Sequence, residues 1–244
     1  MRNPNSSAKT GNRPVGRNLD EVVRWCDHIG MFALDRPMQS SCVHATVVCW
    51  EECYNWALHR VYRLMSRKDV RNEDAWVSID PQSAEYLAEK FQRCRSRQTR
   101  RARFMTRGEA FSYPVDVDRV AEVCNATPDT MWWCPTRAWR EPLLRLLIEA
   151  MDAPNLVVLA SLDPSNTLED YEDLRRDGWS TMYFGDTSEA SKSGRFLCPK
   201  NWRGSKSERN PKGVPEGHCA ICKGGCFAPA VMGRRVDVHL GGSG

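Results

Sequence analysis

Residues 131–184 read MWWCPTRAWREPLLRLLIEAMDAPNLVVLASLDPSNTLEDYEDLRRDGWSTMYF, and this stretch decides the fold. Short apolar runs alternate in it with amphipathic stretches: the runs lie at 131–134, 156–161 and 181–184, and the stretches at 138–151 and 168–176. The apolar runs predict buried strands, and the amphipathic stretches predict helices. Regular alternation of strand and helix predicts right-handed βαβ units on a parallel sheet.

The same pattern continues toward the amino terminus. Strands are expected at 31–34 and 103–106, and helices at 18–30, 51–67, 83–97 and 115–124. Five strands in this order predict an α/β fold in which a partial or open βα barrel carries a cysteine-rich, metal-bound C-terminal segment.

Composition divides the 244 residues into four parts. They are a disordered N-terminal tail at 1–17, a βα-repeat domain at 18–190 with the first cysteine cluster, a cysteine-rich metal-binding segment at 191–230, and a C-terminal tail at 231–244. The tails are expected because they are polar or rich in glycine. One main domain is the expectation for a chain of this length.

The composition also disfavours several classes of protein. Eleven cysteines without a secretory leader predict a reducing compartment, the cytoplasm, where clustered thiols bind metal more often than they form disulfides. No apolar run is long enough to cross a bilayer, so no membrane role is expected. The motifs of serine hydrolases, phosphate-binding loops and zinc proteases are missing as well.

The first cysteine cluster is Cys42, Cys49 and Cys53, in SSCVHATVVCWEECYNW. These cysteines are predicted on a loop and at the entrance of a helix, where backbone N–H groups favour thiolates. Three thiolates leave one iron of a four-iron cluster, or one position on zinc, for another ligand. His44 is a candidate for it, although a histidine without a role in the loop is the simpler interpretation.

The second cluster is Cys219, Cys222 and Cys226, in HCAICKGGCF. A Cys-x-x-Cys turn beside glycines is typical of zinc ribbons and of ferredoxin-like loops. Cys198 is the expected fourth ligand, and His218 is the alternative. The isolated Cys26, Cys94 and Cys124 are expected to be buried apolar residues, whereas Cys134 could be a core residue or a ligand.

Polar residues follow the predicted strands directly. Glu109 lies after the strand at 103–106, Thr136 and Arg137 after the strand at 131–134, and Asp163 after the strand at 156–161. The carboxyl ends of parallel strands meet at one face of such folds. These residues are therefore candidates to line a pocket, against the simple alternative that loops are polar anyway.

An arginine-rich run, FQRCRSRQTRRARFMTR, precedes and enters the strand at 103–106. Its arginines could bind a phosphate backbone, or could belong to the solvated end of a helix. The seven candidates are Arg93, Arg95, Arg97, Arg100, Arg101, Arg103 and Arg107.

Several of these motifs resemble one family of cysteine-rich phage and prophage proteins, the gene-product-eighty-eight-like proteins. The resembling stretches are HIGMFALDRPMQSSCVHATVVCWEECYNW, RFMTRGEAFS, WWCPTRAW, NLVVLASLD and the closing CP…CxxC…C-aromatic pattern. The family resembles radical S-adenosylmethionine enzymes, whose partial barrels carry a CxxxCxxC loop after the first strand. Here Cys49 and Cys53 supply the CxxxC, Trp56 stands after it in place of a cysteine, and Cys42 lies upstream.

The resemblance implies an iron–sulfur protein that binds S-adenosylmethionine and acts on nucleic acid or a nucleotide. Arg137 would then pair with the cofactor's carboxylate, and Glu109 with its ammonium group or a ribose hydroxyl. The alternative is a non-enzymatic zinc protein that docks nucleic acid or a partner protein.

Overall fold

A computed structural model describes residues 23–26, 31–53, 55, 63–79, 85, 89, 101–185, 196–198, 226, 235 and 237–239. Its centre is an eight-stranded sheet of order β1-β2-β3-β4-β5-β6-β8-β7. The strands are β1 (Val23–Cys26), β2 (Met31–Leu34), β3 (Arg101–Phe104), β4 (Met131–Thr136), β5 (Leu156–Leu162), β6 (Ser180–Tyr183), β7 (Phe196–Leu197) and β8 (Asp237–His239). All neighbouring pairs are parallel except β1 with β2. The α/β class expected from the sequence is therefore confirmed.

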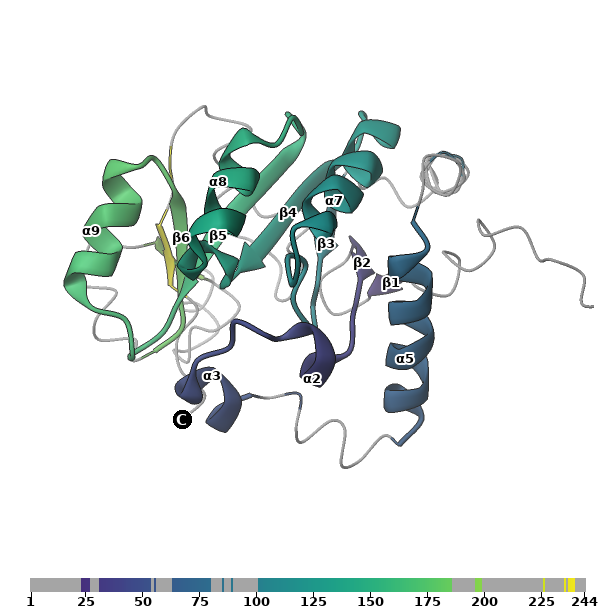
Figure 1. Ribbon diagram of the computed structural model, residues 1–244, viewed down its shortest axis with the longest axis horizontal. Coiled ribbons are helices and arrows are strands. Elements are labelled where there is room, and N and C mark those ends of the chain that lie inside the picture. Colours follow the sequence, from purple (N-terminus) through teal and green to yellow (C-terminus); the bar gives the residue numbers. More distant parts are fainter. Residues whose placement is uncertain are drawn as a thin grey trace, which may run out of the picture.

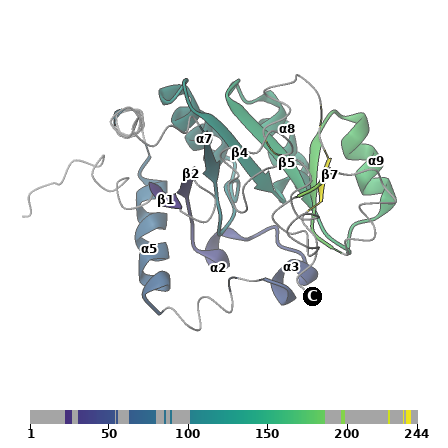
Figure 2. The same cartoon turned by 180° about the vertical axis from the view of Figure 1, so that it is seen from behind.

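Three helices connect successive neighbours in the sheet and cover one of its faces (Figures 1 and 2). They are α7 (Val115–Ala126), α8 (Pro142–Ala150), which follows the short turn η2 (Ala138–Arg140), and α9 (Leu168–Arg176). Local sequence explains their starts: Pro142 occupies the first turn of α8, and Thr167 and Asp170 form a capping box on α9. Because the strands that these helices connect run parallel, the polar loops after the strands gather at one edge of the sheet.

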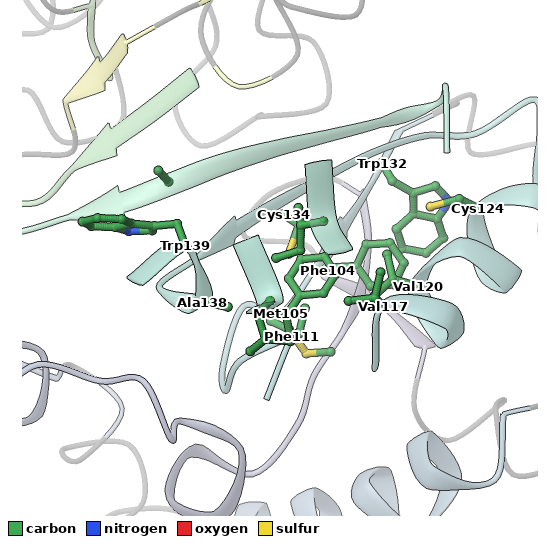
Figure 3. Packing of buried hydrophobic residues seen from close by; sticks show 14 of the residues in the cluster. Phe104, Met105, Phe111, Val117, Val120, Cys124, Trp132, Cys134, Ala138 and Trp139 are labelled. Atoms are coloured by element: carbon green, nitrogen blue, oxygen red, sulfur yellow. The ribbon is translucent and has the colours of Figure 1, made fainter. Parts of the chain in front are cut away.

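The helix-covered face is packed with large aromatic and branched residues. Phe104 of β3 stacks on Trp132 of β4, with ring centroids 4.3 Å apart, and Trp76 meets Phe104 edge-on. Figure 3 shows Val117 and Val120 of α7 beside this pair. Trp76 belongs to α5 (Arg63–Val77), so this helix joins the same core.

The opposite face of the sheet is buried as well. It carries a second apolar cluster that includes Trp133, Val157, Leu159 and Met182, with Cys198 and Cys226 packed against it. Adjacent residues of one strand, such as Trp132 and Trp133, thus serve opposite cores. Burial on both faces explains why the strands are continuous apolar runs rather than alternating ones.

Two expectations about the ends of the chain need correction. Residues 18–30 were expected to form a helix, but Val23–Cys26 forms β1, antiparallel to β2. Tertiary pairing with the sheet overrides the helical spacing of Val22, Val23 and Cys26. Residues 231–244 were expected to form a tail, but Asp237–His239 forms β8, which lies between β6 and β7. Hydrogen bonds from Thr181 Oγ1 and Tyr171 Oη to Asp237 fix this strand.

Other expectations concern residues outside the described part of the chain. The tail at 1–17 and nearly all of the expected helix at 83–97 lie there. The loop expected to carry Cys42 is interrupted by α2 (Met38–Ser41) and leads into α3 (Val47–Glu51). Figure 1 shows both short helices at the edge of the sheet toward which β4 and β5 point.

Asn155 is expected to be important for stability. Its Nδ2 donates to the carbonyl oxygens of Cys124, Thr127 and Thr130 at 2.9 to 3.0 Å, and so joins the end of α7 to the start of β5. Replacing Asn155 by Ala leaves these buried carbonyls without that donor and should lower the free energy of unfolding by about 1 to 3 kcal/mol. Urea unfolding measures this. The exposed Asn125 on α7 is the control, and an equal effect of Asn125→Ala would contradict the assignment.

Candidate functional site

A pocket of about 190 Å³ lies at the carboxyl edge of the sheet. Its wall comes from the segment after β2, from the ends of β3, β4 and β5, and from Phe184 after β6. The chemically important lining residues are Cys42, Cys49, Cys53, Asn55, Arg103, Glu109, Thr136 and Arg137. The structure thus brings the first cysteine cluster to the same cavity as three of the four residues expected after the strands.

The cysteine segment is held by the cap of α3. Thr46 is the N-cap residue, and its Oγ1 accepts a hydrogen bond from the backbone N–H of Cys49 at 3.0 Å. The same hydroxyl donates to Asp163 Oδ2 at 2.5 Å. One buried threonine therefore fixes the start of α3 and ties it to the loop after β5.

Asp163 lies behind the pocket wall rather than in it. It is fully buried, and its Oδ2 pairs with Nη1 of Arg137 at 2.6 Å. Its Oδ1 accepts from both the backbone N–H and the hydroxyl of Ser165. With both oxygens engaged, Asp163 positions Arg137 and Thr46, and it does not take the pocket-lining position expected of it.

Glu109 links two of the strand ends. Its Oε1 accepts hydrogen bonds from Thr136 Oγ1 at 2.8 Å and from the backbone N–H of Phe111, and its Oε2 accepts one from the backbone N–H of Arg137 at 2.9 Å. The carboxylate is therefore largely satisfied inside the protein. Its main effect is to hold the loops after β3 and β4 in one arrangement.

Gly108, directly before Glu109, is required by the backbone. Its φ is +81°, and a Cβ placed there would come within 2.7 Å of the Arg36 carbonyl oxygen and 2.6 Å of Ser41 Oγ. The loop after β3 can therefore pack against the segment after β2 only with glycine at this position. The close approach also allows Ser41 Oγ to accept a hydrogen bond from the backbone N–H of Glu109 at 3.0 Å.

The surroundings of Cys42 and Cys49 raise the pKa values of these two thiols. Burial, with the nearby charges of Glu109, Cys49 and Cys53, raises the pKa of Cys42 to about 12. Burial also raises the pKa of Cys49, while the charge of Arg137 and a hydrogen bond from it act in the opposite direction. These mutual effects indicate that the thiols are close enough to influence one another.

The thiols surround the cavity without meeting at one point. Among the residues that the structure describes, no three histidine, cysteine or carboxylate side chains come close enough together to hold one metal ion. His44 donates through Nε2 to the carbonyl oxygen of Ser112 at 3.3 Å and does not line the pocket. Cys42, Cys49 and Cys53 nevertheless line one cavity, which is where a group held by them would bind.

The second cysteine cluster is described only in part. Cys198 and Cys226 are half-buried and pack against the apolar cluster on the face of the sheet opposite α7, α8 and α9. Cys219, Cys222 and His218 lie outside the described residues, as does Cys94. Cys124 and Cys134 are buried in the core on the face of the sheet that α7, α8 and α9 cover, and burial raises the pKa of both thiols. Cys134 is thereby assigned to the core.

The described part of the arginine run is engaged within the protein. Arg107 forms ion pairs with Asp35 and Asp69, at 3.2 and 3.1 Å. Arg103 lies over the ring of Trp133. Arg101 belongs to β3, and Arg93, Arg95, Arg97 and Arg100 lie outside the described residues.

Sequence reasoning missed several residues that shape the site. Thr46 was recognisable, because a threonine before an apolar helical run is an N-cap signal. Nothing local marks Asn55 or Arg103 as pocket residues, because their neighbours there come from distant segments. Ser41 is hidden in the same way, since its partner Glu109 is 68 residues away.

Comparison with known proteins gives one match. A family described as gene product 88 matches residues 4–224. No curated protein and no solved structure matches the chain. No helix in the described part of the chain is long and apolar enough to cross a membrane.

Proposed function

The chain belongs to the phage-type gene product 88 family, and we propose that it is an iron–sulfur protein whose cluster occupies the pocket at the carboxyl edge of the sheet. The observation that carries the proposal is the convergence of Cys42, Cys49 and Cys53 on one cavity. Four-iron clusters are held by cysteine thiolates, and three thiolates leave one iron open to a further ligand. A bound cluster of this type supplies one-electron chemistry.

The thiols also have suitable surroundings for a cationic group. Burial and mutual repulsion keep the pKa of Cys42 high, so its thiolate forms readily only with a positive partner. The half-buried thiols lie in a pocket whose lining is partly apolar, such as Met105, Pro135 and Phe184. Limited access of water favours retention of a cluster.

The ligand of the open iron would be S-adenosylmethionine or a related amino-acid-like molecule. Arg137 has guanidinium nitrogens beyond the Nη1 that pairs with Asp163, and they can donate hydrogen bonds to the carboxylate of such a ligand. Glu109 and Asp163 act in this proposal by holding Thr136 and Arg137 in place. The reaction would be of the radical type and its substrate a nucleotide or nucleic acid.

The sheet supports an enzyme-like architecture. Strands β2 to β6 follow one another in sequence order, with α7, α8 and α9 on one face, and this order supports the partial βα barrel that we propose. Cavities at the carboxyl ends of such strands are the usual sites of chemistry. Unpaired thiols in one pocket suit a reducing compartment, so the proposal places the protein in the cytoplasm.

Replacing Cys49 by Ser should abolish most iron binding. The protein is prepared without oxygen, reconstituted with iron and sulfide, and analysed for iron, sulfide and zinc. Replacing a residue that only hydrogen-bonds to a metal ligand typically lowers metal affinity by about 10- to 100-fold. Loss of a ligating thiolate should therefore reduce the iron content at least tenfold. Cys124→Ala is the control, because this buried core thiol lies outside the pocket. Equal iron in the parent and in Cys49→Ser would contradict the proposal.

The zinc protein is the second candidate. Cys198 and Cys226 pack against the same apolar cluster although 27 residues separate them in sequence, which supports a structural site shared with Cys219 and Cys222. Nucleic acid would then dock through the arginines at 93–100. Colourless protein with stoichiometric zinc and no reconstituted iron would favour this candidate over the cluster protein.

A further inference from the structure

Arg103 is held at two points inside the pocket. Its register partner on β4 is Trp133, and the guanidinium carbon lies 4.5 Å from the centroid of the Trp133 ring. Its Nε donates to the carbonyl oxygen of Met105 at 3.1 Å. Stacking and this hydrogen bond together restrict a side chain that is otherwise flexible.

The residue that accepts this hydrogen bond has a strained backbone. Met105 has φ +56°, the sole positive value outside glycine in the described residues. Such a conformation costs about 1 to 3 kcal/mol in a non-glycine residue and is typically retained at functional sites. The N–H of Met105 donates to the Leu34 carbonyl oxygen at 2.7 Å, so the surrounding strands maintain the turn.

The charge of Arg103 has no acidic partner among the described residues. Three arginines line the pocket, of which Arg107 pairs with Asp35 and Asp69, and Arg137 pairs with Asp163. The carboxylate of Glu109 is occupied by Thr136 and by two backbone N–H groups. Since Nε of Arg103 is used by Met105, its two Nη groups remain for a ligand.

We propose that Arg103 forms an oxyanion subsite, which holds the phosphate or carboxylate group of a small molecule in the pocket. Two parallel N–H donors of a guanidinium match the two oxygens of such a group. The inference rests on the proposed function for the choice of ligands to test. It extends that function because it assigns the pocket a further anchoring point, in addition to the thiols and Arg137.

Binding of matched ligand pairs tests the subsite. The first pair is adenosine 5′-monophosphate and adenosine, and the second is S-adenosylmethionine and its decarboxylated form. In titration calorimetry under anaerobic conditions, the anionic member of at least one pair should bind the parent protein about tenfold more tightly or better. A preference within the first pair identifies a phosphate ligand, and a preference within the second identifies a carboxylate ligand.

The variants then locate the preference. Arg103→Gln should remove a preference for phosphate and should reduce a preference for carboxylate, to which Arg137 also contributes. Arg103→Lys, which keeps the charge but lacks the two parallel N–H donors of a guanidinium, should retain only part of the preference. Arg176→Gln removes an exposed positive charge on α9 and should leave the preference unchanged. The proposal is overturned if the parent shows no preference within either pair, or if Arg103→Gln keeps it.

Separate measurements distinguish this inference from the iron–sulfur proposal. Arg103→Gln should retain the iron content and far-ultraviolet circular dichroism of the parent. If the parent binds no iron but still prefers the anionic ligands, the cluster proposal fails and the subsite stands. If Arg103→Gln does not fold, Arg103→Lys decides: an undiminished preference in this variant overturns the role of the guanidinium fork.

Discussion

Replacing Asp116 by Asn should lower the free energy of unfolding by about 3 to 5 kcal/mol, the typical cost of breaking a buried ion pair. Asp116 is fully buried at the start of α7. Its Oδ2 accepts from Arg36 Nη1 and from the backbone N–H groups of Ser112 and Tyr113, each at 3.0 Å. Its Oδ1 accepts from Trp76 Nε1 at 2.7 Å and from Arg119 Nη1 at 2.8 Å.

The loss is large because every neighbour of this carboxylate is a donor. An amide in its place would turn an NH₂ group toward one set of donors, and Arg36, which is 1 % exposed, would lose part of its charge compensation. Urea unfolding of the parent and the variant measures the difference. Asp118→Asn is the control, since Asp118 lies in the same first turn of α7 but is exposed. Similar losses in the two variants would show that the helix dipole, and not the network, is responsible.

Replacing Asp163 by Asn should have the second large effect, about 3 kcal/mol or more at neutral pH. The variant leaves the guanidinium of Arg137, which is 8 % exposed, without its carboxylate, and it weakens the bond to Thr46. Because these two residues adjoin Cys49, reconstituted iron should also fall, by about tenfold. Asp152→Asn, at an exposed position after α8, should change neither stability nor iron. If a folded Asp163→Asn protein binds as much iron as the parent, Asp163 does not position the residues around Cys49.

The effect of Asp163 should depend on pH. Burial alone would raise the pKa of this carboxyl group, but hydrogen bonds from Ser165 and Thr46 and the charge of Arg137 outweigh it and lower the pKa below its ordinary value of 3.8. The ionised form is therefore favoured by folding, and its contribution is complete above 3.8 and is lost as the pH falls through the lower value of the folded protein. Unfolding measured from pH 7 down to about pH 2 should show a constant difference between the parent and Asp163→Asn above 3.8 and a shrinking difference below it. A difference that stays constant over the whole range would contradict this linkage.

The sequence predicted the repeating part of the fold well. The strands at Met131–Thr136 and Leu156–Leu162 and the helices α7 and α9 lie where apolar runs and amphipathic spacing indicated them. β1 was predicted incorrectly, because a four-residue strand at the edge of a sheet is defined by its partner and not by its own sequence. β8 was not predicted for a similar reason, because its partners β6 and β7 are distant from it in the chain.

The site was predictable in location but less so in detail. The loops after the strands and the cysteine segment meet in one pocket, as expected from the common direction of parallel strands. The sequence did not show which of these residues contact a ligand and which hold other residues in place. Asp163 and Glu109 resemble ligand-binding carboxylates in the sequence, and only their partners Arg137 and Thr136 identify them as supports. Arg36 was not considered at all, because its partners Glu73 and Asp116 lie 37 and 80 residues away.

The hydrogen bond between Thr46 and Asp163 has a consequence for the order of events during protein synthesis. The two residues are 117 positions apart, so at about 5 to 20 residues per second the ribosome needs roughly 6 to 23 s to add Asp163 after Thr46. During this interval the thiols of Cys42, Cys49 and Cys53 have left the ribosome, or are leaving it, without the strand that anchors them. The nascent chain thus exposes its reactive sulfur atoms before their pocket exists, and these residues are most vulnerable to oxidation at that stage.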